Sequence, residues 1–323
     1  MIRIHEQNYR TDMDSTVLPF LEARKSAGTF ERTAGVPIYY EHFTADDAKG
    51  TLVLVHGFSE SLPKFYETIY VFLNLGWHVW AIQQREHGLS FRSSQDPALI
   101  DITDYRDLIR DLHFFVKKIV CASPENKNST LPRVLYGHSM GGGISACYLE
   151  CYPDDFCKAI LSSPMLELNS GQIPAPVAEM YAKLMIRLGK GQQYMPGAAP
   201  FQDRPDLEGS CTSCEARYAY WFSIQREHPE YQMCVPSIHS ALQFLNITRF
   251  AVNPRHTRVI TASILLFQAG KDTMVKPGGQ DKFVLLLGDH ARLVRIPEAK
   301  HEIYFENDQI LERYWGEIES FLQ

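Results

Sequence analysis

The sequence contains no apolar run long enough to cross a membrane. Its longest apolar segments, for example residues 71–75 and 264–267, are far shorter than the roughly 20 residues that a bilayer-spanning helix needs. The first 15 residues are polar and charged and lack the apolar stretch of a secretory signal. We therefore expect a cytoplasmic protein that is at most peripheral at the inner face of the membrane.

The sequence also has no excess of basic residues over acidic ones. The chain has 32 Lys and Arg against 38 Asp and Glu, which gives a formal net charge of −6, and its basic residues do not cluster. Because nothing in this composition would attract the phosphate backbone of a nucleic acid, we do not expect nucleic-acid binding.

The cysteines do not follow the pattern of a disulfide framework or of a metal site. There are seven of them, an odd number, scattered along the chain. This usage is typical of reduced thiols in a cytosolic protein. Cys211 and Cys214 make a CxxC pair, but no second pair and no His pair at metal-ligand spacing accompanies them. We expect neither a metal ion nor a cofactor.

What the chain does have is a regular alternation of short apolar segments and amphipathic segments. The apolar segments predict buried strands at residues 51–55, 77–82, 133–136, 158–161, 263–267 and 291–296. Residues 103–121 illustrate the predicted helices, with Leu108, Leu112 and Phe115 three or four positions apart. This order predicts an α/β fold with a mostly parallel sheet and helices on both faces. For the first 35 residues we expect a helix followed by an edge strand.

The alternation breaks between residues 165 and 250. Prolines divide this block into short helical pieces, at Pro174, Pro176, Pro196, Pro200, Pro205, Pro229 and Pro236. A chain of 323 residues is long for one minimal domain and short for two full-sized ones. We therefore interpret residues 165–250 as a helical cap, inserted into a single core that is formed by residues 1–164 and 251–323.

A candidate nucleophile lies between a predicted strand and a predicted helix. The segment Gly137-His138-Ser139-Met140-Gly141 has the form G-x-S-x-G. A serine on so tight a turn is held in a strained backbone conformation with its hydroxyl exposed at the end of the strand. Small residues two positions before and after the serine avoid clashes between the crossing backbones.

Two further residues fit the roles of base and acid beside Ser139. A serine hydroxyl needs a base, and a neutral imidazole needs a partner that fixes its tautomer. Asp272 follows the predicted strand 263–267, and His301 follows the predicted strand 291–296. Because the carboxyl ends of parallel strands meet at one edge of a sheet, we expect Ser139, Asp272 and His301 to come together as nucleophile, orienting acid and general base.

Backbone N–H groups near these residues fit an oxyanion hole, which needs two donors aimed at a carbonyl oxygen that gains charge. We expect one donor from Met140, at the start of a helix whose dipole favours an anion. The other is expected from Phe58, in the loop His56-Gly57-Phe58-Ser59 after the first central strand. We expect His56 itself to be structural.

The segments around these candidates form a recognisable set: Leu54-Val55-His56-Gly57-Phe58, Arg85-Glu86-His87-Gly88-Leu89-Ser90, Tyr136-Gly137-His138-Ser139-Met140-Gly141-Gly142 and Lys300-His301-Glu302. They resemble the α/β-hydrolase superfamily, and in particular its lysophospholipase and monoacylglycerol lipase branch. Residues 213–231 and 301–308 are similar to the bacterial inner-membrane lysophospholipases. The resemblance implies an α/β-hydrolase fold and a serine hydrolase that cleaves a carboxylic ester, most simply the acyl ester of a lysophospholipid.

One segment departs from the family pattern. Where Asp-x-Arg-Gly-(His or Gln)-Gly is usual, this chain has Gln83-Gln84-Arg85-Glu86-His87-Gly88. An acidic group is lost and a glycine becomes glutamate, so we expect this loop to be shaped or hydrogen-bonded differently.

Specificity is expected to reside in the cap. Six residues there are candidates for lining an acyl-chain pocket: Met180, Leu184, Met185, Tyr218, Trp221 and Phe222. The alternative is that these side chains simply pack the cap onto the core, since aromatic and Met residues at helical spacing are usually core. The resemblance also implies access to lipid, which would need an apolar patch on the cap because the protein as a whole is acidic.

Three other functions stay open on the sequence. A monoacylglycerol lipase or a general carboxylesterase would use the same triad on another small lipid or ester. An iminopeptidase-type amide hydrolase would need acidic cap residues to hold the substrate amine, for which Glu179, Glu208 and Glu215 are candidates. A non-catalytic binding module on this fold typically lacks a triad member, whereas this chain keeps all three.

Overall fold

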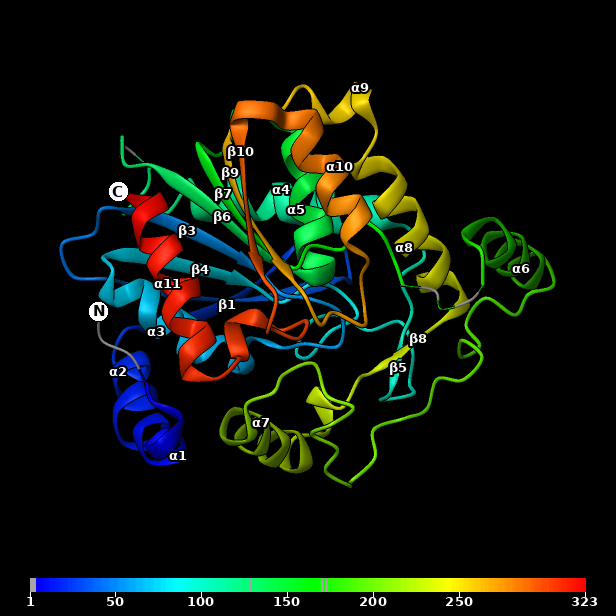
Figure 1. The fold of residues 1–323 in the computed structure, drawn as a ribbon, viewed down its shortest axis with the longest axis horizontal. Helices are drawn as coiled ribbons and strands as arrows, with labels where there is room; N and C mark the ends of the chain where they lie inside the picture. The colour runs from blue at the N-terminus through cyan, green and yellow to red at the C-terminus, as the bar shows by residue number, and fades with distance from the viewer. Residues whose placement is uncertain (1–3, 128, 170, 172) are drawn as a thin grey trace.

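The computed structural model describes residues 4–127, 129–169, 171 and 173–323. Its centre is an eight-stranded sheet with the order β1-β2-β4-β3-β6-β7-β9-β10 (Figure 1). The strands are β1 (Lys25–Glu31), β2 (Pro37–Phe43), β3 (Gly50–Val55), β4 (Trp77–Ile82), β6 (Arg133–His138), β7 (Lys158–Ser162), β9 (Ser263–Ala269) and β10 (Ala291–Ile296). The six strands from β3 onward are parallel to one another, whereas β2 pairs antiparallel with both β1 and β4. The predicted α/β fold with a mostly parallel sheet is confirmed.

Helices cover both faces of this sheet, which is why the central strands are apolar along their whole length. One face carries α3 (Tyr66–Asn74), α11 (Asp308–Leu322) and the N-terminal α1 (Tyr9–Asp12) and α2 (Leu18–Glu22). The other face carries α4 (Tyr105–Phe114), α5 (Ser139–Cys151), α8 (Ile238–Ala251) and α10 (Pro277–Leu287). Every residue of β3, between these two layers, is buried.

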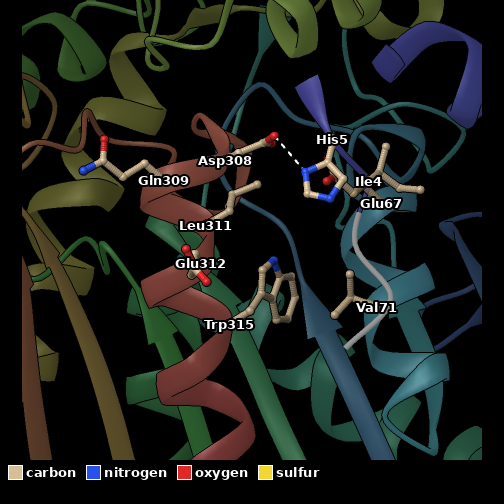
Figure 2. A pocket seen from close by; sticks show the side chains of 9 residues that line it. All are labelled: Ile4, His5, Glu67, Val71, Asp308, Gln309, Leu311, Glu312 and Trp315. Atoms are coloured by element: carbon tan, nitrogen blue, oxygen red, sulfur yellow. Dashed lines mark hydrogen bonds and ion pairs between the residues drawn. The ribbon is translucent and has the colours of Figure 1, made fainter. Parts of the chain in front are cut away.

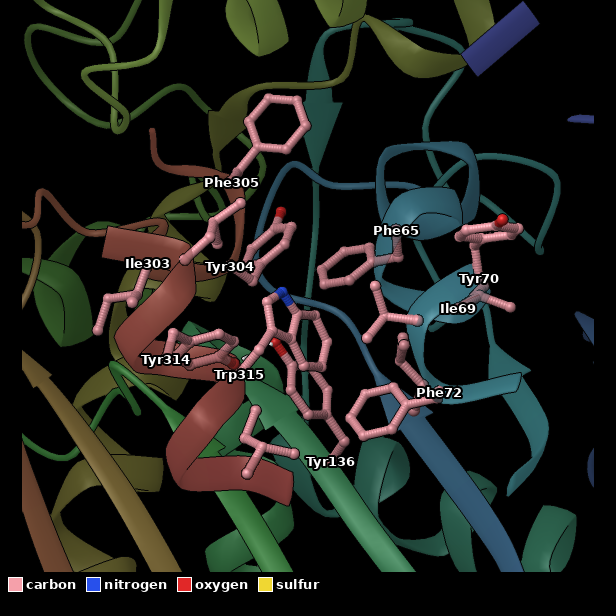
Figure 3. Close-up of a cluster of buried hydrophobic side chains, with 14 of the residues drawn as sticks. Phe65, Ile69, Tyr70, Phe72, Tyr136, Ile303, Tyr304, Phe305, Tyr314 and Trp315 are labelled. Carbon is pink, nitrogen blue, oxygen red and sulfur yellow. Dashed lines mark hydrogen bonds between the residues drawn. The ribbon is translucent and has the colours of Figure 1, made fainter. Parts of the chain in front are cut away.

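Aromatic side chains fill the layer under α3 and α11 (Figure 3). The ring of Phe72 meets the rings of Trp315 and Tyr136 edge-on, with centroid separations of 5.2 and 5.7 Å. The hydroxyls of Tyr136 and Tyr314 are 2.9 Å apart and form a buried hydrogen bond. Edge-to-face contacts and a satisfied phenol are the usual way in which such large rings are buried without a polar penalty. These contacts fix α11, and with it the loop that precedes it, against the sheet.

The segment between β7 and β9 leaves the sheet and returns to it. It contains α6 (Ala175–Arg187), α7 (Glu215–Glu227), the short β8 (Val235–Pro236), which pairs with β5 (Leu99–Ile100), and then α8. Figure 1 shows α6 and α7 well apart from each other at the periphery of the molecule. α8 packs on both α5 and α6, so that the last helix of the range assigned to the cap also covers the core.

α7 is fastened to the core by a buried arginine. Arg217 is fully buried, donates to both carboxylate oxygens of Glu67 at 2.8 and 2.7 Å, and donates to the carbonyl oxygen of Ile4 at 2.9 Å. Tyr220 of the same helix meets Tyr9 edge-on at 5.5 Å. Because Glu67 lies on α3 and Ile4 in the N-terminal segment, one side chain joins three parts of the chain.

Among the described residues, no helix is long and apolar enough to span a bilayer.

Candidate active site

Ser139 stands at the turn where β6 passes directly into α5. Its backbone φ is +51°, in the left-handed region that a residue with a side chain rarely occupies. A Cβ added to Gly141 would lie 2.3 Å from the carbonyl oxygens of both Val55 and His56. A Cβ on Gly137 would lie 2.5 Å from the hydroxyl of Ser145. The close approach of α5 to β3 at Gly141, and to β6 at Gly137, therefore leaves room only for glycine at these two positions, as the G-x-S-x-G spacing predicts.

The three candidates for nucleophile, base and acid form one hydrogen-bonded line. His301 Nε2 is 2.8 Å from the hydroxyl oxygen of Ser139, and His301 Nδ1 is 2.7 Å from Oδ2 of Asp272. Asp272 follows β9 and His301 follows β10, so that all three lie at the carboxyl edge of the sheet. If Nδ1 carries the proton and donates to Asp272, Nε2 is free to accept the proton of Ser139.

The carboxylate of Asp272 is held from both sides. Its second oxygen, Oδ1, accepts the backbone N–H groups of Met274 and Val275 at 2.8 and 3.0 Å. Burial by itself would raise the pKa of Asp272. The hydrogen bond and charge of His301, together with the two backbone donors, outweigh burial and hold the pKa below its ordinary value. Asp272 is thus kept as a charged acceptor facing the imidazole.

The loop after β3 lies directly against the serine. A Cβ on Gly57 would be only 3.0 Å from the Cβ of Ser139. The N–H of Phe58, the next residue, belongs to this loop, and the N–H of Met140 belongs to the first turn of α5, where backbone N–H groups have no partner within the helix. The structure therefore brings both expected oxyanion donors to the neighbourhood of Ser139.

His56 uses both ring nitrogens to hold loops together. The backbone N–H of Gln84 donates to Nε2 at 2.9 Å, and Nδ1 donates to the carbonyl oxygen of Gly57 at 2.7 Å. Burial lowers the pKa of His56, which keeps the ring in the neutral form that these two bonds need. No ring nitrogen is left for a proton transfer.

Comparison with known proteins identifies the family. Residues 46–308 match the family model described as serine aminopeptidase, S33. The chain belongs to the S33 hydrolase family. Among relatives, a monoacylglycerol lipase from Mycolicibacterium smegmatis is 27% identical over 300 residues, which cover 90% of this chain and 95% of that protein. A probable lysophospholipase L2 from Haemophilus influenzae is also 27% identical, over 290 residues that cover 89% of this chain and 88% of that protein.

Solved structures agree on the fold. The crystal structure of a soluble variant of monoglyceride lipase from Saccharomyces cerevisiae, in complex with a substrate analog, matches with a TM-score of 0.73 at 20% identity. The match covers 93% of this chain and 95% of that chain. The α/β-hydrolase fold expected from the sequence is confirmed, and the S33 hydrolase is an enzyme of the serine hydrolase class.

The segment that departs from the family pattern is tied to the loop of residues 56–59 in this S33 hydrolase. Gln84, besides its bond to the ring of His56, donates from its side chain to the carbonyl oxygen of His56 at 2.6 Å. Arg85 donates to Asp111 at 2.6 Å. Glu86 has a φ of +66°, which a glycine would adopt without strain, and accepts the backbone N–H of Ser93 at 3.0 Å. The glutamate thus replaces glycine at some backbone cost and fastens the following loop.

The six cap residues proposed for an acyl pocket are not brought together. Met180, Leu184 and Met185 lie on α6, where Met180 and Leu184 are exposed, while the three aromatic residues lie on the distant α7. Trp221 is buried in the core, and Tyr218 stacks on Phe222 with centroids 5.9 Å apart. Phe244 of α8, by contrast, does meet the loop of residues 56–59, since its ring centroid lies 5.1 Å from that of Phe58. No signal in the sequence separates Phe244 from other apolar residues of α8.

A pocket of about 200 Å³ opens elsewhere, between the N-terminal segment, α3 and α11 (Figure 2). It is lined by Ile4, His5, Glu67, Val71, Asp308, Gln309, Leu311, Glu312 and Trp315, and contains no residue of the line that joins Ser139 to Asp272. Within the described ranges, no group of three or more His, Cys, Asp or Glu residues could hold a metal ion. Cys211 and Cys214 are both free thiols.

Proposed function

We propose that this S33 hydrolase cleaves the acyl ester of a lysophospholipid, with Ser139 as nucleophile, His301 as general base and Asp272 as the acid that orients the histidine. The observation that carries the proposal is the hydrogen-bonded line from Ser139 through His301 to Asp272, with distances of 2.8 and 2.7 Å. The lysophospholipid is favoured by the segments 213–231 and 301–308, which are similar to the bacterial inner-membrane lysophospholipases.

The reaction proceeds in two steps. His301 takes the proton of Ser139 as its oxygen attacks the ester carbonyl, and the N–H groups of Phe58 and Met140 stabilise the resulting oxyanion. Collapse of this intermediate breaks the ester bond, leaves the acyl group on Ser139, and passes the proton from His301 to the departing alcohol. A water molecule that His301 then deprotonates releases the fatty acid and restores the serine.

A monoacylglycerol is the second candidate substrate. It is favoured by the relative from Mycolicibacterium smegmatis, whose name is monoacylglycerol lipase and whose identity of 27% equals that of the lysophospholipase relative. An amide substrate with a free amine is less well supported. Of the acidic cap residues that would hold the amine, Glu179 is already engaged by Arg249 and Lys183 at 2.6 Å each.

The first prediction concerns this choice of substrate. Fatty-acid or amine release is measured for a lysophospholipid, a monoacylglycerol, a diacyl phospholipid, a short-chain ester and a proline anilide. We expect kcat/KM for the lysophospholipid to exceed that for the others by about tenfold or more. The cap would contact a head group that the monoacylglycerol, the short-chain ester and the anilide lack, whereas the diacyl phospholipid has the head group but brings a second acyl chain that the site would have to accommodate. A monoacylglycerol preferred over the lysophospholipid would select the second candidate, and release from the anilide alone would contradict an ester substrate altogether.

We also propose that α6 contacts the lipid surface from which the substrate is taken. Exposed apolar residues recur every three or four positions along α6 and at the residue that follows it. Val177, Met180 and Leu184 of the helix, and Leu188 just after it, are 47%, 67%, 55% and 60% exposed. Lys183 pairs with Glu179 of the same helix, but Arg187 and Lys190 leave this part of an acidic protein with a local positive charge. An apolar helix face flanked by basic residues is the pattern of a helix that lies in a membrane interface with anionic lipids.

The second prediction tests this surface. The double variant Val177→Glu and Leu188→Glu is expected to bind anionic phospholipid vesicles about tenfold or more weakly, because two apolar side chains no longer leave water on binding. Hydrolysis of a water-soluble short-chain ester should be retained. Leu285→Glu is the matched control, since Leu285 is 81% exposed but lies on α10, away from α6. Equal vesicle binding by the double variant and the control would contradict the proposal.

A further inference from the structure

A buried carboxylate that takes no part in the reaction described above holds the loop beside Ser139. Glu60 is only 3% exposed. Its Oε2 accepts the backbone N–H of Gly57 at 2.6 Å, and its Oε1 accepts the hydroxyl of Tyr304 at 2.6 Å. The ammonium of Lys64 lies 3.4 Å from the same Oε1. A buried charge of this kind is costly unless it is well paired, so its partners are the first guide to its role.

The hydrogen bond to Gly57 bears directly on the oxyanion hole. The peptide group between Gly57 and Phe58 is planar and trans, so its C=O and N–H point in opposite directions. His56 holds the C=O of this peptide through Nδ1, and Glu60 holds the N–H of the peptide before it. The two bonds fix Gly57 from both sides. They therefore fix the direction in which the N–H of Phe58 points, in the loop that lies against Ser139.

The same carboxylate is linked to the loop that carries His301. Lys64 donates to Glu302, the residue after His301, at 2.6 Å, while Tyr304 reaches Glu60 directly. Burial by itself would lower the pKa of Lys64, but the charges of Glu302 and Glu60 outweigh it and leave the pKa raised. The ring of Tyr304 also stacks on Phe65, with centroids 4.5 Å apart (Figure 3). Glu60 and Lys64 thus join the oxyanion loop to the loop of the general base.

From these contacts we infer that Glu60 is a positioning residue of the proposed reaction. It holds the N–H of Phe58 toward the developing oxyanion, and it keeps this loop in register with the loop of His301. The inference rests on the proposed function, because it gives Glu60 a role only if an oxyanion forms beside Ser139. Since donors stabilise charge only when they are held in advance in the correct direction, loosening the loop should slow the chemistry more than it weakens substrate binding.

The third prediction is therefore a kcat effect. The concentration of active sites is first counted by complete reaction with a fluorophosphonate, so that kcat can be given per active site. Glu60→Ala is then expected to lower kcat about 10- to 100-fold and to leave KM within about threefold. Glu60→Gln keeps an oxygen that accepts from Gly57, so it should recover most of the loss. Affinity for a trifluoromethyl ketone, whose bound adduct places an oxyanion in the hole, should fall by the same factor as kcat/KM.

The chain offers a closely matched control. Asp155 is also a buried carboxylate that accepts a tyrosine hydroxyl, from Tyr148 at 2.7 Å, and a lysine ammonium, from Lys117 at 2.8 Å. It lies just before β7 begins, at the opposite edge of the sheet from Ser139. Asp155→Asn should lower the melting temperature and leave kcat per active site unchanged, since it disturbs packing alone.

Two outcomes would overturn the inference. One is a Glu60→Ala enzyme whose kcat per active site stays within twofold of the wild type. The other is a lowered kcat with unchanged affinity for the trifluoromethyl ketone. If Glu60→Ala does not fold, Tyr304→Phe, which removes one bond to Glu60, carries the same test with an expected fall in kcat of about three- to tenfold. Ser139→Ala in the same assay distinguishes failure of this inference from failure of the proposed function. Full activity in that variant would refute the proposed function itself.

Discussion

Ser139→Ala is expected to lower the turnover of the preferred ester roughly a millionfold, to the rate that binding and the oxyanion donors support without a nucleophile. The variant should fold normally. Alanine at position 139 keeps the backbone at the same φ of +51° and removes only a hydroxyl. The measurement is fatty-acid release under single-turnover and steady-state conditions, with the melting temperature as a check on folding.

A second serine of the same helix serves as the control for this result. Ser145 lies on α5, is buried, and has no hydrogen-bond partner for its hydroxyl within the described structure. Ser145→Ala should keep activity within about twofold, because no buried partner is left unsatisfied. Comparable losses in both variants would mean that disturbance of α5, and not loss of a nucleophile, explains the effect.

Asp272→Asn is expected to lower kcat about ten-thousandfold through the tautomer of His301. The carbonyl oxygen of the new amide would stay with the two backbone donors of Met274 and Val275, because only an oxygen can accept them. Its NH₂ group would then face His301 Nδ1 and make that nitrogen an acceptor. The ring proton would move to Nε2, which could no longer accept the proton of Ser139.

The stability of this variant gives an independent check. Because the pKa of Asp272 is lowered by folding, its charge stabilises the native state above the ordinary pKa of 3.8, and this contribution is lost as the pH falls through the lowered value. The wild type should therefore be more stable than Asp272→Asn at neutral pH, and the difference should shrink in acid. Asp281→Asn, at an exposed ion pair with Arg295, is the control with little expected effect on either measurement. If Asp272→Asn lowers kcat by less than tenfold, the proposal that Asp272 orients His301 is contradicted.

The central strands and their edge could be predicted because burial on both faces leaves a simple signal. A parallel strand between two helical layers is apolar throughout, and β10 begins and ends at the residues expected for it. Residues that follow such strands must meet at one edge, which is why Asp272 and His301 could be paired with Ser139 across 133 and 162 positions of sequence by topology alone. The antiparallel β2 was not predicted, since a strand near the sheet edge has no such continuous apolar run.

Contacts between distant polar residues could not be predicted in the same way. Glu60 and Tyr304 are 244 positions apart, and neither carries a pattern that identifies the other. The prediction that six cap residues line one acyl pocket did not hold for a related reason. Periodicity shows that α6 has an apolar face, but it does not show what covers that face, and Met180 and Leu184 prove to be exposed. Sequence therefore located the three residues of the proposed triad better than the residues that hold them or the exposed face of α6.

The measurement that tests the central claim most directly is mass spectrometry of the protein after reaction with a fluorophosphonate. The reagent is expected to add once, on the peptide that contains Ser139, and to leave Ser139→Ala unmodified. Asp272→Asn should react at the same site but far more slowly. A wild-type protein that does not react, or one modified at another serine while Ser139 stays free, would contradict the account.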